Sequence, residues 1–310
     1  MPAIRVVEPG FQTTVQDLGR PGCAHMGVSP SGAADALSLR LGNLLVGNPE
    51  NSASLEMTLS GGVFEFEGDC LIALTGSDFA SRLDGMPAPN WVPIAVKSGQ
   101  VLRCGKTRAG ARCYLSVHGG IDEPLALGSA STHLLAGMGG HEGRALRAGD
   151  VLRVAVPAAP SRHVKQVHPQ RALRWLATDV IRITPGPQAH WFSADSVERF
   201  LETPAMVLEA FSRAAIHLAA RRLELVRRDE MLIEGVCCGA VQVPPTGRPV
   251  ILFVERQTTG NFPKFANVIT ADLPRVGQLK PFDKFRFELV SFDEAREVLR
   301  QQEEWIDSLE

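Results

Sequence analysis

The chain has 310 residues, of which 45% are hydrophobic and 21% are charged, a composition typical of ordinary soluble globular proteins. Its 32 basic and 34 acidic side chains leave a formal charge of −2, and no basic stripe suited to a nucleic-acid backbone occurs. This length predicts two domains of about 150 residues, or one large β-rich body.

Neither a membrane nor a metal is an expected partner. Apolar runs such as Pro249–Val254 fall far short of the roughly 18 residues that a membrane-spanning helix needs. The N-terminus moves directly into a strand-like run without a signal-peptide core, which predicts a cytoplasmic location. The six cysteines are scattered without a Cys-x-x-Cys pair, so neither a metal site nor a disulfide framework is expected.

Helical patterns are few. The first covers about 33–46, where apolar residues recur at helical spacing and Gly47-Asn48-Pro49 provides a stop. A short helix is expected over 193–201. The last begins at Ser291, which forms a capping-box pattern with Glu294.

Between these helices the sequence predicts many short strands, separated by turns of glycine, proline and aspartate. The expected strands include 70–75, 91–96, 101–104, 112–117, 151–156, 181–184, 239–243, 250–254 and 285–290. This succession of short strands and turns is typical of barrels or sandwiches and not of an alternating βαβ sheet. The predicted fold class is therefore mainly β with a few short helices.

The domain organisation follows from a change in composition. Residues 157–170 are rich in proline and polar residues and lack periodicity, as in a linker. We therefore predict an N-terminal lobe over 1–158, a linker over 159–170, and a C-terminal lobe with a terminal helix over 171–310. Leu146–Val154 and Leu279–Phe287 share the order leucine, basic residue, turn, aspartate, strand, which indicates two related lobes facing each other.

Two polar, glycine-flanked segments, Gln12–Arg20 and Gln257–Lys264, are the candidate functional loops. Each gathers amide, hydroxyl and charged groups where glycine and proline impose a loop. The second directly follows the apolar strand 250–254, whose end should be well anchored. In the first loop, a structural ion pair or turn cap between Asp17 and Arg20 is as plausible as a functional role. We predict that both loops contribute to one pocket between the lobes.

Other catalytic motifs are absent or incomplete. Gly99–Thr107 resembles a phosphate-binding loop, but five residues separate its glycines where four are required, and a strand follows instead of a helix. We expect no nucleotide site there. His141-Glu142 lacks the second histidine of a zinc protease, and no Gly-x-Ser-x-Gly elbow occurs.

A series of ordered motifs resembles a known family. They are Glu8–Arg20, Ser31–Asp35, Asn43–Asn48, Leu55–Gly61, Gly119–Asp122, Leu127–Thr132, Gly186–Gln188, Gly239–Pro244, Gln257–Gly260 and Pro263–Lys264. Together they resemble the KipA-like family, also described as the biotin-dependent carboxyltransferase or allophanate hydrolase subunit 2 family. The motifs span nearly the whole chain.

The resemblance implies two cyclophilin-like β-barrel domains. It also implies a KipI-like (PxpB-type) partner subunit and, in the 5-oxoprolinase branch, a LamB/YcsF-like (PxpA-type) subunit, which together hydrolyse 5-oxoproline to glutamate at the expense of ATP. The ATP would bind with or on a partner subunit. Relatives in urea carboxylase instead transfer a carboxyl group from carboxybiotin to an amide nitrogen. A third possibility is a non-catalytic antagonist of a KipI-like kinase inhibitor.

Residue roles are assigned here from residue type. A resonance-stabilised amide needs donors for its oxygen and a base or acid to complete its cleavage. Asp17, Arg20 and Asp35 are the candidate catalytic residues. The candidate substrate-binding residues are Gln16, Ser31, Gln188, Gln242, Gln257, Thr258, Thr259 and Lys264.

The sequence departs from the family pattern in the segment Phe211–Leu218. Ala215 replaces a usual glycine, and His217 replaces a usual arginine. A missing glycine can forbid a positive φ, and histidine lacks the bidentate fork of arginine. These changes do not affect the predicted fold, but they leave the identity of the substrate open. A related lactam or urea-like compound is therefore an alternative to 5-oxoproline.

Overall fold

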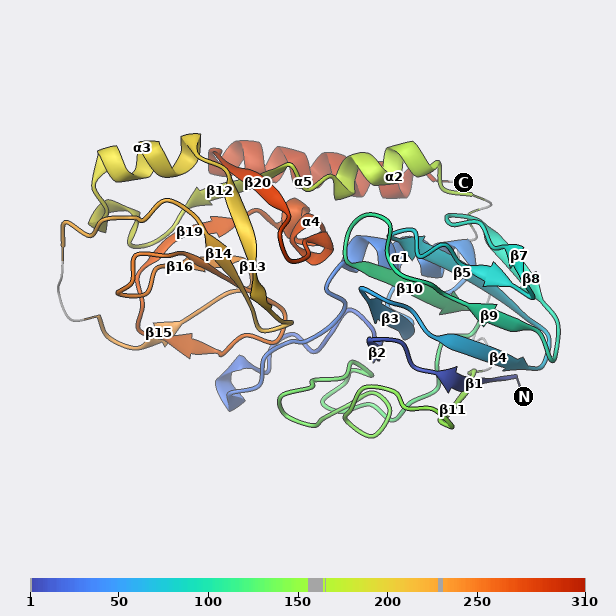
Figure 1. The fold of residues 1–310 in the computed structure, drawn as a ribbon. Helices are drawn as coiled ribbons and strands as arrows, with labels where there is room; N and C mark the ends of the chain where they lie inside the picture. Colours follow the sequence, from blue (N-terminus) through green and yellow to red (C-terminus); the bar gives the residue numbers. More distant parts are fainter. Residues whose placement is uncertain (1, 156–163, 165, 228–230, 310) are drawn as a thin grey trace. The chain divides into compact units, whose positions relative to one another are not determined.

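A computed structural model describes residues 2–155, 164, 166–227 and 231–309. The chain divides into two compact units. Unit 1 comprises Met1–Arg20, Ser31–Arg174 and Ser308–Glu310, and unit 2 comprises Pro21–Pro30 and Trp175–Asp307. Part of the linker predicted over 159–170 lies outside the described residues. Figure 1 shows the elements of each unit.

Unit 1 is built from two antiparallel sheets. The six-stranded sheet has the order β11-β1-β4-β9-β6-β7 and the five-stranded sheet the order β2-β3-β10-β5-β8. Their strands are β1 (Ala3–Glu8), β2 (Gln12–Gln16), β3 (Ser54–Thr58), β4 (Val63–Glu67), β5 (Cys70–Gly76), β6 (Arg82–Leu83), β7 (Met86–Pro87), β8 (Pro93–Val96), β9 (Val101–Arg103), β10 (Arg112–Val117) and β11 (Val151–Arg153).

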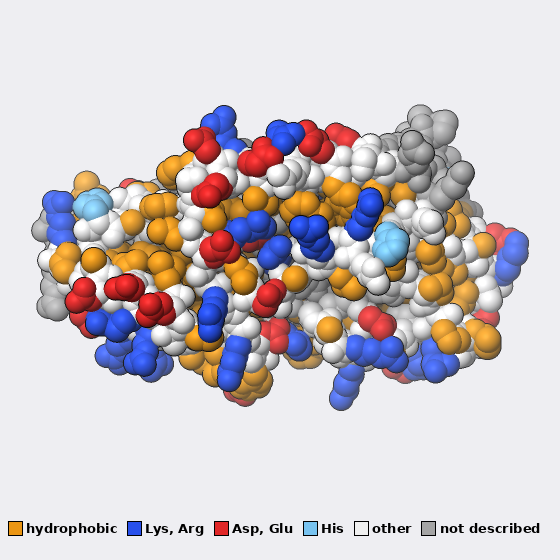
Figure 2. Space-filling view, turned by 90° about the horizontal axis from the view of Figure 1, so that it is seen from above, with side chains coloured by type: hydrophobic (Ala, Val, Ile, Leu, Met, Phe, Trp, Pro, Cys, Tyr) orange, Lys and Arg blue, Asp and Glu red, His pale blue; other side chains and the backbone are white. Residues whose placement is uncertain are grey.

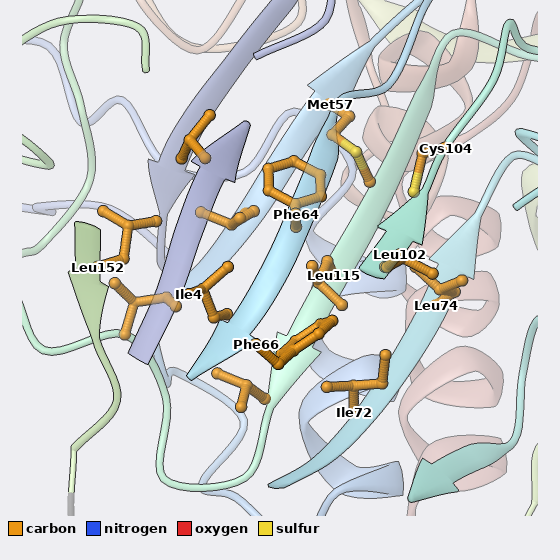
Figure 3. Packing of buried hydrophobic residues seen from close by; sticks show 14 of the residues in the cluster. Ile4, Met57, Phe64, Phe66, Ile72, Leu74, Leu102, Cys104, Leu115 and Leu152 are labelled. Atoms are coloured by element: carbon orange, nitrogen blue, oxygen red, sulfur yellow. The ribbon is translucent and has the colours of Figure 1, made fainter. Parts of the chain in front are cut away.

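The core of unit 1 lies between these sheets. Alternate residues of β1 and β4, such as Ile4, Phe64 and Phe66, meet Leu74 and Leu115 from β5 and β10 (Figure 3). All of these side chains are fully buried. A strand places successive side chains on opposite faces, so the period-2 pattern decides which face of each sheet enters the core.

Unit 2 contains a closed barrel of the strands β12-β19-β16-β17-β14-β13-β20 and a separate two-stranded ladder of β15 and β18. These strands are β12 (Val180–Pro185), β13 (Ala205–Phe211), β14 (Ala215–Ala219), β15 (Glu234–Gly235), β16 (Ala240–Gln242), β17 (Val250–Leu252), β18 (Thr259–Gly260), β19 (Lys264–Val268) and β20 (Lys284–Leu289). The prediction of a mainly β fold with few helices is confirmed.

The helices agree with the sequence patterns at three positions and add two that the sequence did not indicate. They are α1 (Ala36–Leu45), α2 (Pro169–Leu176), α3 (Ala194–Glu202), α4 (Leu273–Gln278) and α5 (Phe292–Asp307), with 3₁₀ turns η1 (Ala24–Met26), η2 (Ala189–Trp191) and η3 (Thr270–Asp272). The predicted capping box is present at α5, where Ser291 N–H donates to Glu294 at 2.7 Å and Glu294 N–H donates back to Ser291 Oγ.

Figure 2 looks onto α3 and α5, where acidic and basic side chains lie among hydrophobic ones without a continuous basic stripe. Within the described ranges, no helix is long and apolar enough to span a bilayer.

The predicted sequence repeat corresponds to two turns with the same contacts. In unit 1 the Asp150 carboxylate accepts from Arg147 N–H at 2.7 Å, and Asp150 N–H donates to Arg147 O at 3.2 Å. In unit 2 the Asp283 carboxylate accepts from Lys280 N–H at 3.1 Å, and Asp283 N–H donates to Lys280 O at 3.1 Å. Each aspartate therefore closes its own turn immediately before a strand.

The residue before each aspartate has a positive φ and donates a backbone hydrogen bond to another strand in both units. Gly149 has a φ of 93° and donates to Val6 O at 2.8 Å, while Phe282 has a φ of 72° and donates to Val207 O at 2.9 Å. Left-handed backbone is costly for a side chain other than glycine. The turn geometry is therefore common to both units although its residue types differ.

The segment Gly99–Thr107 contains a turn and strand β9, as predicted, and does not open a helix. Ala215 lies in β14, opposite Leu252, and its φ is not positive. Replacement of the usual glycine is therefore compatible with this backbone. His217 is exposed on the same strand.

Candidate functional site

In unit 1, Asp17 forms the centre of a buried hydrogen-bond network. Its Oδ1 accepts from Gly19 N–H at 2.7 Å and from the hydroxyls of Ser129 and Ser131, each at 2.6 Å. Its Oδ2 accepts from Ala130 N–H at 2.7 Å. The carboxylate therefore joins the Gln12–Arg20 segment to the chain at 129–131, and its oxygens are already occupied by fixed donors.

Gln16 and Arg20 extend this network toward the same neighbouring chain segment. Gln16 Nε2 donates to Thr14 Oγ1 at 3.0 Å and to Thr132 O at 3.1 Å. Arg20 Nε donates to Ala126 O at 3.1 Å, and its Nη2 donates to Ser131 O. Both side chains are buried, with 0% and 1% of their surface exposed.

Asp35 and Ser31 are the remaining candidates in unit 1. Asp35 is the N-cap of α1: its carboxylate accepts from Ser38 N–H at 2.9 Å and from Ser38 Oγ at 2.5 Å. The Asp35 N–H donates to Tyr114 Oη, which in turn donates to Glu56 at 2.7 Å. Ser31 Oγ donates to Thr132 O at 2.6 Å. Asp17, Gln16, Arg20 and Ser31 thus meet the chain at 126–132, whereas the contacts of Asp35 are with α1 and β10.

In unit 2, two candidate residues, Thr258 and Lys264, line a cavity of about 310 Å³. We call it the Lys264 pocket. Its lining residues are Ala24, Pro187, Glu234, Gly235, Val236, Cys237, Thr258, Lys264 and Asn267. Strands β15 and β19 and the residues next to them supply most of this wall, so the late loop of the sequence analysis lies at a pocket.

Gln188 fixes Lys264 by both its backbone and its side chain. Gln188 N–H donates to Lys264 O at 3.2 Å, and Lys264 N–H donates to Gln188 Oε1 at 3.1 Å. The Gln188 Nε2 and the Lys264 Nζ both donate to Glu234 Oε1, the former at 2.8 Å. Lys264, through this hydrogen bond and its charge, holds the pKa of Glu234 below its usual 4.5.

The other candidates of unit 2 surround the same loop. Gln242 is buried; its Nε2 donates to Phe262 O and its Oε1 accepts from Gln257 Nε2, both at 3.4 Å. A Cβ on Gly260 would lie 2.7 Å from Gln242 Nε2, so a larger residue there would displace the Gln242 amide. Thr259 pairs with Gly235 in the ladder of β15 and β18. Thr258 lines the Lys264 pocket.

Sequence reasoning missed Glu234, Cys237 and Asn267 as pocket residues. Cys237 Sγ lies 3.1 Å from Asn267 Oδ1, and burial of the neighbouring Cys238 raises the pKa of its thiol to about 11. The one available signal was a charged residue, Glu234, between the apolar pair Leu232-Ile233 and a glycine. Such a position gives no indication of its partner, because Glu234 meets Lys264 only through folding of the ladder.

Unit 2 also has a larger cavity, of about 850 Å³, which meets the same loop at Phe262 and Pro263. Trp191, Arg222 and Pro244 are among its other lining residues. None of the individually chosen site residues lines it, whereas Thr258 and Lys264 line the smaller pocket. Among the residues with described positions, no three His, Cys, Asp or Glu side chains form a group that could hold a metal ion.

Comparison with known proteins gives consistent relationships over the whole chain. Residues 26–289 match the family described as carboxyltransferase domain, subdomain A and B. The chain is 36% identical to the C subunit of 5-oxoprolinase from Escherichia coli and 37% identical to that from Haemophilus influenzae. Each alignment covers 99% of this chain and 97% of the relative.

A solved structure gives the same relationship in three dimensions. The Kluyveromyces lactis urea carboxylase is 34% identical, with a TM-score of 0.91 over 99% of this chain. This chain spans only 29% of that polypeptide. The similarity therefore concerns one part of a much longer protein.

Proposed function

We propose a function from the premise that the chain belongs to the carboxyltransferase family of subdomains A and B. Its function is that of the C subunit in an ATP-dependent 5-oxoprolinase, which hydrolyses 5-oxoproline to glutamate. The observation that carries this proposal is the alignment with two 5-oxoprolinase C subunits over 99% of this chain and 97% of theirs. Mutual coverage matters because a shared domain inside a longer enzyme would leave most of the relative unmatched.

The Lys264 pocket supports this substrate by its chemistry. 5-Oxoproline is a small lactam with one carboxylate and one amide. A pocket of about 310 Å³ accommodates such a molecule. The ammonium of Lys264 and the amide of Gln188 are donors for its carboxylate, while Thr258 and Asn267 offer polar groups for its amide.

The residues of this chain would bind and orient the lactam. Amide resonance resists attack by water, and ATP would supply a phosphoryl group that, on the amide oxygen, makes the amide carbon easier to attack, so that the ring C–N bond can then break. Lys264 Nζ is positioned to balance negative charge near the substrate, because its backbone is fixed at both N–H and C=O by Gln188. ATP and the complementary catalytic groups are assigned to the partner subunits, a KipI-like and a LamB/YcsF-like chain.

For the unit 1 candidates we propose a supporting role. The Asp17 carboxylate is occupied by Gly19, Ala130 and two serine hydroxyls, and Asp35 caps α1. The Asp17 contacts hold the Gln12–Arg20 segment in one conformation. Arg20 donates hydrogen bonds to the backbone carbonyls of residues 126 and 131, and Gln16 and Ser31 donate to that of residue 132, which holds the same two segments together.

A second candidate, biotin-dependent carboxyl transfer to urea or a related amide, is favoured by the TM-score of 0.91 with urea carboxylase. Urea would also fit the Lys264 pocket, but it has no carboxylate to engage Lys264. The sequence contains no Ala-Met-Lys-Met-like attachment site, so biotin would arrive on another protein.

The experiment assembles the chain with its partner subunits and measures glutamate release from 5-oxoproline with ATP. We expect turnover in the wild-type complex and a loss of about 100-fold in Lys264→Gln, since one preorganised charged donor contributes that much. Lys97→Gln is the matched control, because Lys97 forms an exposed pair with Asp69 at 2.7 Å in unit 1. Carboxylation of urea by a carboxybiotin donor, without glutamate release, would instead support the second candidate.

A further inference from the structure

Two hydrogen-bond donors, Lys264 from the lining of the Lys264 pocket and Gln188 next to the lining residue Pro187, converge on a single carboxylate oxygen. Lys264 Nζ and Gln188 Nε2 both donate to Glu234 Oε1. One ammonium and one primary amide on the same oxygen form a binding site for a carboxylate. In the described conformation, a side chain of the protein itself occupies this site.

The donors and the acceptor differ in how firmly they are held. The Lys264 side chain is 4% exposed and the Glu234 side chain is 43% exposed. Lys264 begins the barrel strand β19 and is fixed by two backbone contacts with Gln188. Glu234 lies in β15, whose ladder with β18 consists of the pairs Glu234–Gly260 and Gly235–Thr259 and is followed by one bond, from Val236 N–H to Thr258 O at 3.0 Å. Lys264 therefore belongs to the rigid barrel, and the carboxylate belongs to a short, exposed ladder.

Glu234 carries its negative charge at neutral pH, because Lys264 holds the pKa of this carboxyl below 4.5. The buried ammonium of Lys264 needs an anion beside it, whereas the Glu234 carboxylate is half-exposed and can be hydrated when it leaves, so exchange of Glu234 for another carboxylate keeps the charge of Lys264 balanced. An incoming ligand with a carboxylate would meet the same two donors, Lys264 at the pocket wall and Gln188 beside it. A neutral ligand would have no such advantage.

We propose that Glu234 is an internal substitute for the substrate's carboxylate and leaves Lys264 and Gln188 when an anionic lactam binds. It rests on the proposed function, because it assigns specificity within the same pocket. Glu234 thereby selects for ligands that carry a carboxylate: a neutral amide can accept hydrogen bonds but brings no charge to balance Lys264, so it binds beside an intact ion pair. Glu234 competes with the anionic substrate and sets its affinity.

The test measures binding by calorimetric titration of the assembled complex with 5-oxoproline and with 2-pyrrolidinone, the same lactam without a carboxylate. Glu234→Gln removes the competing charge and leaves Lys264 without its counter-ion. We expect 5-oxoproline to bind about fivefold more tightly to this variant, since loss of competition from a carboxylate that is itself 43% exposed is worth about 1 kcal/mol. Binding of 2-pyrrolidinone should stay within about twofold of wild type.

Glu224→Gln is the matched control, because Glu224 lies in the same unit and its pair with Arg199, at 3.7 Å, is exposed on both sides. It should change neither titration. Unchanged or weaker binding of 5-oxoproline to Glu234→Gln would overturn the proposal, as would equal tightening for both lactams. A loss of kcat with unchanged affinity would make Glu234 a catalytic group and overturn it as well.

Glu234→Ala provides a second route if Glu234→Gln unfolds, and the same tightening is expected. Unfolding of both variants, seen by circular dichroism, would also contradict the proposal, because a displaceable side chain cannot be essential to the fold. Turnover is a separate readout. A wild-type complex that binds 5-oxoproline but releases no glutamate would reject the proposed function and leave the titrations to decide the role of Glu234.

Discussion

At the scale of single residues, burial separates lysines that otherwise have similar partners. Lys264, Lys97 and Lys280 each pair with a carboxylate, but their side chains are 4%, 74% and 32% exposed. Exposed pairs are weak because water screens them, whereas a buried ammonium must be balanced by a partner or a ligand. The Lys264 ammonium is therefore the one of these three whose charge bears on binding.

The same reasoning applies to two aspartates that close similar turns. Asp17 Oδ1 accepts from Gly19 N–H, and Asp78 Oδ1 accepts from Ala80 N–H, each at 2.7 Å and two residues ahead. Asp17 is buried and accepts three further donors, while Asp78 is exposed. We expect Asp17→Asn to lower the free energy of unfolding by about 2–4 kcal/mol, because the new NH₂ group would face donors.

Denaturant unfolding of Asp78→Asn provides the control for this prediction. Its pair with Arg108, at 2.9 Å, is exposed, so the expected loss is at most about 1 kcal/mol. Similar losses in both variants would show that the buried network around Asp17 contributes no more than the turn itself. The support role proposed for the Gln12–Arg20 segment would then be wrong.

At the scale of elements, the sequence predicted those that have strong local signals. The apolar stripe and cap of α5 predicted its start, and the expected strands matched β12, β16, β17 and β20 of the barrel within a few residues, whereas β13, β14 and β19 were not among them. The sequence did not predict α4, because the helix has only 6 residues and contains Gly277, which disfavours helix interiors. Pro274 lies in the first turn, where proline is tolerated, and Gly277 is buried, so tertiary packing supports this short helix.

The candidate site was predictable only in part, for a related reason. Residues close to one another in the loop, such as Thr258 and Lys264, could be grouped from the sequence. Glu234 could not be joined to them, because its position depends on the pairing of β15 with β18. Local patterns predict which residues lie in a loop, but pairing between distant strands decides which side chains meet.

The repeated turn allows an element-scale prediction with reciprocal variants. Gly149 has a φ of 93° and open space at the position of a Cβ, so Gly149→Ala adds backbone strain without a clash. We expect it to lower the free energy of unfolding by about 1–2 kcal/mol. Phe282→Gly, at the matching position with a φ of 72°, should remove strain and cost less than Gly149→Ala.

Thermal unfolding of the two variants checks this prediction. Phe282 is 61% exposed, so little apolar contact is lost when its side chain is removed. A larger loss for Phe282→Gly than for Gly149→Ala would contradict the equivalence of the turns. It would show that the Phe282 side chain stabilises unit 2 through packing.

At the scale of the whole molecule, the chain combines two units that each have their own sheets and buried side chains. Longer relatives carry the equivalent region within a larger polypeptide, as in urea carboxylase, of which this chain spans 29%. Under the proposed function, partner subunits would supply the groups that complete catalysis at the Lys264 pocket.

The final prediction concerns which unit responds to substrate. Hydrogen exchange of the assembled complex, with and without 5-oxoproline, should show increased protection in 234–237 and 258–267, which contain most of the lining of the Lys264 pocket. We expect little change in Gln12–Arg20, because Asp17, Gln16 and Arg20 are already held by neighbouring donors and carbonyls. Lys97→Gln serves as the control, because it changes an exposed lysine that is far from this lining in sequence and should leave the pattern of protection unchanged.

Protection of both Gln12–Arg20 and Gln257–Lys264 would support the sequence hypothesis of one pocket shared by the two loops. Lys264→Gln distinguishes direct contact from a general tightening of the molecule. If unit 1 touches the ligand, its protection should fall together with that of unit 2 in this variant, since both depend on the same bound molecule. If protection in unit 1 survives while that in unit 2 is lost, the substrate binds chiefly outside the Lys264 pocket, and the role given to Lys264 would have to be abandoned.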